Sequence, residues 1–152
     1  RGVASRCILT EAGKQFVTPM SVAALSGDTV YDDLFSLTDE AEMGHIELSR
    51  SADLVVVCPA TANLMARLAG GLADDLASTA LLATDKPVLM APAMNVRMWT
   101  HPATEKNVAQ LTGWGVTVME PDEGEMACGE YGPGRLPDVE RIADAVSAAL
   151  QS

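Results

Sequence analysis

The chain has 152 residues, and its 48% hydrophobic content indicates a globular protein rather than a disordered one. A formal net charge of −11 argues against nucleic-acid binding, because phosphate contacts need a basic surface. The sequence shows no apolar run near the ~18 residues of a membrane span and no signal peptide. Three cysteines without a metal-ligand spacing favour a reducing, cytoplasmic setting, and we expect no metal site.

The first third of the chain predicts one strand and several short helical segments. A strand is expected over residues 3–9, followed by a helical turn over 10–16. Thr18 as N-cap and Pro19 as first helical residue predict a helix that ends at Gly27. The polar and acidic stretch 31–44 predicts a loop, and residues 45–51 predict a short helix.

The remaining chain alternates strand and helix. Residues 53–58 form a continuous β-branched run, typical of a parallel strand buried on both faces. A turn over 59–63 leads to helices over 64–68 and 74–83, a strand over 88–91, a helix over 102–112, a strand over 115–119 and an amphipathic helix over 138–150. Residues 120–137, rich in glycine, proline and acidic residues, predict a long loop. This alternation predicts an α/β fold with a parallel sheet, in one domain over residues 1–152.

The segment 91–99 is the most informative part of the chain. It follows a buried strand and places Asn95 where that strand gives way to a helix. In open α/β sheets, ligands bind at this edge. Two methionines and a tryptophan surround the amide with soft apolar groups, which favours a flat conjugated ligand over a sugar or a metal.

Three further residues have chemistry that suits a site, and each also has a structural interpretation. Thr61 opens a helix and is suited to holding an anion or a ring edge, although an ordinary N-cap is the favoured interpretation. His45 is suited to general-base chemistry, although a surface or capping histidine is more common. Cys128, in a glycine-rich segment, is either an accessible proton donor covered by a moving loop or a solvent-exposed cysteine in a flexible turn.

Other reactive residue types are expected to be structural. Cys7 and Cys58 lie in predicted strands and are interpreted as small buried hydrophobes. His101 precedes a proline at a helix start and is interpreted as structural. The pair at positions 74 and 75 is a poor catalytic dyad, because adjacent helical residues point in different directions. We expect one of them to cap or solvate the helix and the other to face a subunit boundary.

Several short segments together resemble the homo-oligomeric, flavin-containing cysteine decarboxylases. They occur in the family's order across nearly the whole chain: Thr10-Glu11-Ala12, Met43-Gly44-His45-Ile46, Pro59-Ala60-Thr61-Ala62-Asn63, Pro92-Ala93-Met94-Asn95 with Met98-Trp99, and Ala127-Cys128-Gly129. The combination of histidine, Pro-Ala-Met-Asn and Ala-Cys-Gly is highly specific. Within the family, the resemblance is strongest to the bacterial branch, often fused to a phosphopantothenate–cysteine ligase domain.

The resemblance implies a Rossmann-like (flavodoxin-like) three-layer fold that binds FMN and assembles as a trimer or dodecamer. The family opens with a strand and a glycine-rich turn for the flavin phosphate, and we expect that strand–helix unit to be missing from this chain. By the same resemblance, the residues near the flavin are Thr10, Thr61, Ala62, Asn63 and Ala93, and the catalytic residues are His45, Asn95 and Cys128. Asn95 and Met98 are expected to bind substrate, and we add Arg135 as a candidate for its phosphate.

The implied reaction is the decarboxylation of 4′-phospho-N-pantothenoylcysteine to 4′-phosphopantetheine in coenzyme A biosynthesis. Oxidation of the CH₂–S⁻ group gives a thioaldehyde, loss of CO₂ gives an enethiol, and Cys128 supplies a proton to its reduction. One alternative is a peptidyl-cysteine decarboxylase that shares His45 and Asn95. Another is a non-catalytic flavin-fold regulatory subunit that binds a phosphatase. A flavin prenyltransferase shares the fold but not the His–Asn–Cys combination.

Overall fold

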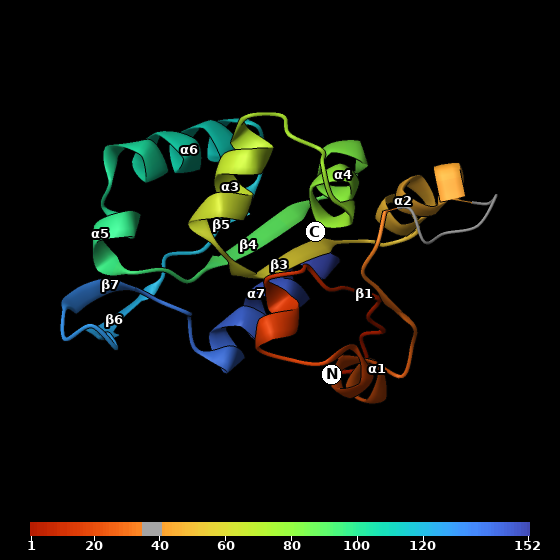
Figure 1. The fold of residues 1–152 in the computed structure, drawn as a ribbon, viewed down its shortest axis with the longest axis horizontal. Helices are drawn as coiled ribbons and strands as arrows, with labels where there is room; N and C mark the ends of the chain where they lie inside the picture. The colour runs from red at the N-terminus through yellow and green to blue at the C-terminus, as the bar shows by residue number, and fades with distance from the viewer. Residues whose placement is uncertain (35–40) are drawn as a thin grey trace. The chain divides into compact units, whose positions relative to one another are not determined.

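The computed structural model describes residues 1–34 and 41–152, with helices and strands alternating along the chain (Figure 1). It contains two compact units, one of Arg1–Ser51 with Ala73–Thr84 and one of Ala52–Leu72 with Asp85–Ser152. Each unit has a parallel sheet, which confirms the α/β prediction. The prediction of one domain stays a prediction. Within the two described ranges, no helix is both long and apolar enough to cross a membrane.

The described residues of the first unit form two short parallel strands and three α-helices. Strand β1 (Cys7–Ile8) pairs with β2 (Val30–Tyr31), and the 3₁₀ helix η1 (Gly13–Gln15) and α1 (Pro19–Ser26) connect them. Helix α2 (Ala41–Arg50) packs against α4 (Leu76–Ala83). The predicted strand over 3–9 is therefore reduced to two residues. The loop predicted over 31–44 is wrong at its ends, which belong to β2 and α2, and its residues 35–40 lie outside the described residues.

Side-chain caps define the helix starts of the first unit. The Thr18 hydroxyl accepts a hydrogen bond from the backbone N–H of Ser21 at 3.2 Å, and Gly27 ends α1 with a φ of +71°. Asp75 accepts from the backbone N–H of Ser78 at 2.7 Å and caps α4. The Thr18 cap confirms its prediction. Asp75 has the capping role, one of the two expected for a residue of the acidic pair, and the helix begins two residues later than predicted.

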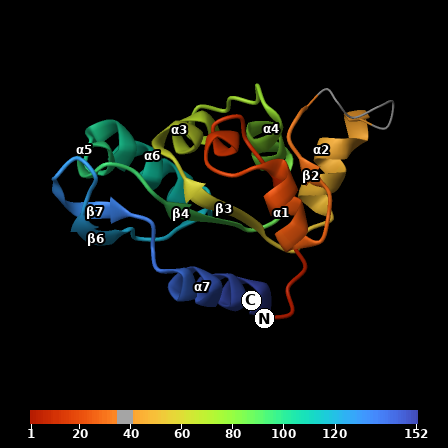
Figure 2. The same ribbon diagram turned by 60° about the horizontal axis from the view of Figure 1, so that its bottom comes forward.

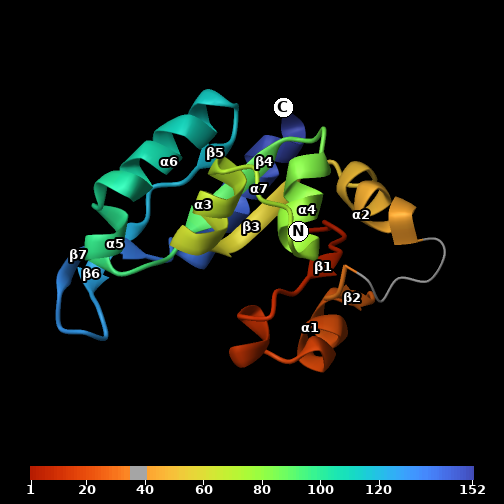
Figure 3. The same cartoon turned by 45° about the horizontal axis from the view of Figure 1, so that its top comes forward.

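The second unit is built on a three-stranded parallel sheet in the order β3 (Val55–Ala60), β4 (Val88–Pro92) and β5 (Thr117–Val118). Helices α3 (Ala62–Ala69) and α6 (Pro102–Gly113) pack together on one face, as Figure 3 shows. Helix α7 (Val139–Gln151) lies on the other face (Figure 2). The central strand β4 is buried along its whole length, and the core includes Met65, Leu89, Met90 and Leu111. A strand covered on both faces has the continuous apolar sequence that predicted it.

Burial of β3 differs from the prediction. This strand lies at the edge of its sheet, and its side chains alternate between half-buried and exposed up to Cys58. Val56 is 39% exposed and Cys58 is exposed, while Cys7 in β1 is half-buried. The interpretation of Cys7 and Cys58 as buried hydrophobes is therefore wrong, because an edge strand has fewer neighbours than a central one.

A β-hairpin replaces the long loop predicted over 120–137. Strand β6 (Asp122–Glu125) pairs in antiparallel register with β7 (Tyr131–Arg135), and β7 packs against the short helix α5 (Val96–Trp99). The loop prediction was wrong because this hairpin uses glycine for close backbone packing. A Cβ on Gly134 would lie 2.3 Å from the carbonyl oxygen of Met94, and one on Gly132 would lie 2.7 Å from Val96.

Candidate active site

The end of β4 leads directly into the candidate site. The backbone N–H of Ala93 donates to the carbonyl of Ala60 at 3.1 Å, which joins the carboxyl ends of β4 and β3. One residue later, the N–H of Met94 donates to the carbonyl of Gly134 at 2.9 Å. Asn95 then caps α5 by accepting from the N–H of Arg97 at 2.8 Å. Asn95 therefore lies at a sheet edge, where the sequence predicted a ligand site.

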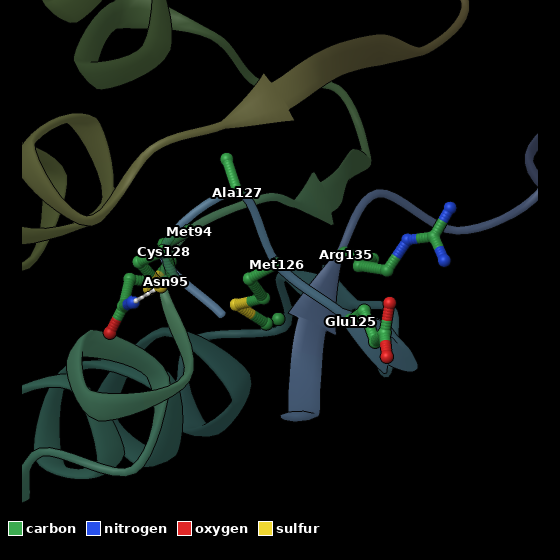
Figure 4. Close-up of a pocket in the computed structure, with 8 residues that line it drawn as sticks. Met94, Asn95, Glu125, Met126, Ala127, Cys128 and Arg135 are labelled. Carbon is green, nitrogen blue, oxygen red and sulfur yellow. Dashed lines mark hydrogen bonds between the residues drawn. The ribbon is translucent and has the colours of Figure 1, made fainter. Parts of the chain in front are cut away.

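Asn95 at the start of α5 and Cys128 between β6 and β7 are 33 residues apart in the sequence and are in contact in the structure. The Asn95 amide Nδ2 donates to the Cys128 sulfur at 3.0 Å (Figure 4). The same nitrogen donates to Oε2 of Glu130 at 2.8 Å. Arg97 donates through Nε to the other carboxylate oxygen of Glu130. The structure thus brings together two of the predicted catalytic residues and adds a carboxylate and a guanidinium to them.

The charges of this cluster are complementary. Hydrogen bonds from Arg97 and then from Asn95 hold the pKa of the Glu130 carboxyl below its usual value, against a smaller opposing effect of burial. The same contact with Glu130 raises the pKa of Arg97. Glu130 is therefore a carboxylate at neutral pH, and it faces one amide, one thiol and one guanidinium.

A pocket of about 510 Å³ opens beside the cluster. It is lined by Met94, Asn95, Glu125, Met126, Ala127, Cys128, Gly134 and Arg135. Asn95 and Cys128 lie at one end, and Glu125 and Arg135 at the other (Figure 4). The Met126 sulfur accepts from the N–H of Val96 at 3.2 Å, which ties the hairpin tip to α5. The pocket has the volume of a small-molecule site, with an amide and a thiol at one end and a carboxylate and a guanidinium at the other.

Two candidate substrate residues differ in their placement. Arg135 is exposed and lines the pocket, and its role as a phosphate contact stays a prediction. Met98 is 48% exposed on α5 and does not line the pocket, so the structure adds no support for its role in substrate binding. Its role in binding stays a prediction.

The turn after β3 holds three candidate cofactor residues. Thr61 caps α3, and its hydroxyl accepts from the N–H of Leu64 at 3.2 Å, as the favoured structural interpretation predicted. Ala62 is half-buried and Asn63 is exposed. Strand β3 extends through Ala60 and α3 begins at Ala62, so only Thr61 of the predicted turn over 59–63 lies between the two elements. Because Ala93 is bonded to Ala60, these three residues and Ala93 adjoin at neighbouring strand ends.

The first unit holds the two other predicted site residues. Thr10 follows β1, and its hydroxyl accepts from the N–H of Gly13 at 3.0 Å. His45 lies on α2 and is half-buried. In the second unit, His101 accepts from the N–H of Ala103 at 3.1 Å and caps α6, which confirms its structural interpretation.

Sequence reasoning missed Arg97 and Glu130. Each lies two residues after a predicted site residue, Asn95 and Cys128 respectively. Their opposite charges were a usable signal, since both segments were already expected at one site.

The sequence is similar to known proteins over most of its length. The sequence matches the family described as Flavoprotein over residues 1–151. The bifunctional coenzyme A biosynthesis protein CoaBC of Escherichia coli (strain K12) is 49% identical over 144 residues, covering 95% of this chain and 36% of that protein. The chain therefore spans about a third of the length of the curated relatives that it matches.

Solved structures are similar over nearly the whole chain. A cysteine-to-serine variant of a PPC decarboxylase, complexed with pantothenoylaminoethenethiol, is 33% identical with a TM-score of 0.87, covering 99% of this chain and 85% of that one. The FMN-dependent cysteine decarboxylase SpaF is 31% identical with a TM-score of 0.78, covering 95% and 77%. These neighbours confirm the predicted flavodoxin-like α/β fold.

Proposed function

The chain belongs to the flavoprotein family, and from this premise we propose that it catalyses FMN-dependent decarboxylation of 4′-phospho-N-pantothenoylcysteine to 4′-phosphopantetheine, in coenzyme A biosynthesis. The names of the CoaBC relative and of the PPC decarboxylase neighbour support this substrate and reaction. One observation carries the proposal in the structure, the 3.0 Å hydrogen bond from Asn95 to Cys128 beside the pocket. It sets a carboxylate-binding amide next to a proton-donating thiol.

The residues at the ends of β3 and β4 fit FMN by the chemistry of their groups. Thr61 and Asn63 are exposed polar residues, and Ala93 is small and half-buried. The first N–H groups of α3 have no acceptor within the helix and suit an anion or a ring edge. We assign these residues, with Ala62, to holding the cofactor. Thr10 keeps the cofactor role that the family resemblance implies for it. When bound, FMN supplies a two-electron acceptor for the substrate CH₂–S group and later returns the electrons.

Each polar residue of the site then has one task. Asn95 gives one of its two amide hydrogens to the substrate carboxylate, in place of one contact that the amide makes within the site, and so aims this group. CO₂ then leaves from a carbon next to the thioaldehyde C=S group, which accepts the electron pair. Cys128 gives the S–H proton to substrate carbon in the final reduction. His45 handles the proton of the oxidative step, a role that rests on the family resemblance. Arg135 binds the substrate phosphate, and Met98 contributes apolar contact.

The test is a turnover assay with the full-length, FMN-loaded protein. We expect CO₂ and 4′-phosphopantetheine, detected by mass spectrometry, from 4′-phospho-N-pantothenoylcysteine. A peptide ending in cysteine serves as the competing substrate. Turnover of the peptide alone would identify a peptidyl-cysteine decarboxylase. A folded, FMN-loaded protein that releases no CO₂ from either substrate would refute the enzyme proposal and favour the regulatory alternative.

The proposal extends to assembly and location. We propose a cytoplasmic homo-oligomer, either a trimer or a dodecamer, and a ligase domain fused to it as in the bifunctional relatives, whose name and greater length support the fusion. Light scattering of the purified full-length protein measures the oligomer. A monomeric mass would contradict the assembly part of the proposal.

A further inference from the structure

Among the described residues, Glu130 is the one charged side chain that forms hydrogen bonds with both Asn95 and Cys128. Its Oε2 accepts from the Asn95 amide at 2.8 Å and from the Cys128 thiol at 3.5 Å. Its Oε1 accepts from Arg97. The Glu130 side chain is 30% exposed, and the Arg97 side chain is 84% exposed. The carboxylate therefore joins the thiol to the amide, with a cation on its outer side.

These hydrogen bonds determine how the thiol points. The two hydrogens of the Asn95 amide match two acceptors, the Cys128 sulfur and the Glu130 oxygen. The sulfur thus accepts from Asn95 and donates its own hydrogen toward Glu130. Without the carboxylate, the S–H bond has no acceptor within this cluster, and rotation about the Cys128 side chain is no longer restricted.

The backbone brings Glu130 back toward the cluster. A tight turn closes with the N–H of Gly129 on the carbonyl of Met126 at 2.8 Å, at a Gly129 φ of +78°. The N–H of Met126 in turn donates to the carbonyl of Glu130 at 2.8 Å. On the other side, the Asn95 side chain accepts from the backbone of Arg97, so the two residues that hold Glu130 are themselves joined. The result is a closed ring of contacts around one carboxylate.

We propose that Glu130, anchored by Arg97, is a positioning residue that holds the Cys128 thiol beside Asn95 for the final protonation of substrate. The inference rests on the proposed decarboxylase function. In that step the S–H bond breaks and a C–H bond forms on the substrate, and FMN would supply the one hydride that the reduction also needs. The Cys128 thiolate regains a proton from water. Glu130 stays ionised throughout, which agrees with its lowered pKa.

The experiment compares Glu130→Gln with Glu123→Gln in the full-length, FMN-loaded protein. Glu123 is exposed on the same hairpin and does not line the pocket, so it is a matched control. Two quantities are measured together: the rate of CO₂ release and the ratio of saturated product to enethiol product. We expect Glu130→Gln to release CO₂ near the wild-type rate while the ratio falls about tenfold, the effect of losing one charge-assisted hydrogen bond. The control keeps the wild-type ratio.

Arg97 variants test the anchor without altering the carboxylate. Because the Arg97 side chain is largely exposed, Arg97→Met is expected to fold normally. It should lower the same product ratio, Arg97→Lys should restore part of it, and Arg97→Met added to Glu130→Gln should cause no further loss. A wild-type ratio in Glu130→Gln overturns the proposal, as does a parallel loss of CO₂ and saturated product. Absence of CO₂ from the wild type instead overturns the decarboxylase function.

Discussion

At the residue scale, the amide of Asn95 is the centre of the site. It caps α5 through its oxygen and contacts Cys128 and Glu130 through its nitrogen. One side chain thus links the start of a helix to the tip of a hairpin. Such a shared residue makes the cluster sensitive to the identity of each member, because a lost partner leaves another polar group unpaired.

Replacement of Cys128 by serine separates the two halves of the proposed reaction. Serine keeps a hydroxyl near Asn95 but is a much weaker acid than a thiol, so proton transfer to substrate slows. We expect Cys128→Ser to release CO₂ and to accumulate the enethiol in place of 4′-phosphopantetheine. Mass spectrometry of the products checks this, with Cys58→Ser as control because Cys58 is exposed and lies outside the pocket lining. Normal 4′-phosphopantetheine formation by Cys128→Ser would remove Cys128 from the mechanism.

The lowered pKa of Glu130 predicts how the cluster responds to acid. A carboxyl group with a folded-state pKa below its unfolded value, 4.5 here, stabilises the folded form fully above pH 4.5. That contribution is lost as the pH falls through the lower folded value. In Arg97→Met the principal cause of the shift is removed, so the Glu130 pKa should rise toward 4.5. A carboxyl ¹³C NMR titration measures both values, and an identical midpoint in the two proteins would contradict the assigned cause.

The sequence identified Asn95 and Cys128 but not their neighbours. Both residues lie in short segments that are specific to the family, and the structure brings them together. Arg97 and Glu130 belong to the site because they form a hydrogen bond with each other, although 33 residues separate them in the sequence. This contact depends on the packing of β7 against α5. No local pattern reports such a contact, and sequence alone therefore gave half of the cluster.

At the scale of elements, local signals predicted helices better than the hairpin. Helix starts depend on neighbouring residues, and Thr18, Asp75 and Thr61 each act as the N-cap expected from their sequence. The hairpin strands contain Asp122-Glu123-Gly124-Glu125 and Tyr131-Gly132-Pro133-Gly134-Arg135, residue types that are mostly depleted in strands. Their pairing is stabilised by contact with α5 instead, which is a tertiary effect.

Glycine at position 134 is required by that contact. Its φ is +148°, and a Cβ there would meet the Met94 carbonyl at 2.3 Å. We expect Gly134→Ala to cost about 1–3 kcal/mol and to lower Tm by several degrees, as strained backbone and a forced shift predict. Gly113→Ala is the control, since no atom lies within 4 Å of a Cβ at that helical position. Equal Tm values for the two variants, measured by calorimetry, would show that the hairpin adjusts at no cost.

At the scale of the whole molecule, the family match and the α/β fold agree over nearly the full chain. The parallel strands of the second unit were predictable because strands such as β4 have a distinct apolar sequence, whereas β2 of the first unit was not predicted. The division into two compact units was not, because the chain passes between them more than once and no linker composition marks the passages. Periodicity reports which face of an element is buried but not which elements form one unit.

Cofactor binding should appear as a change in global stability. A ligand that binds only the folded state stabilises it by RT ln(1 + [L]/Kd), about 2.7 kcal/mol at a hundredfold excess over Kd. We therefore expect removal of FMN to lower Tm, and each tenfold increase in added FMN to raise it by a constant increment. Riboflavin, which lacks the phosphate, is the control and should give a smaller shift at equal concentration, since it cannot make the phosphate contacts that the family resemblance implies for FMN. Scanning calorimetry of the full-length protein measures both series.

A Tm independent of FMN would contradict the cofactor assignment, and equal shifts from both flavins would show that the protein recognises the ring and not the phosphate.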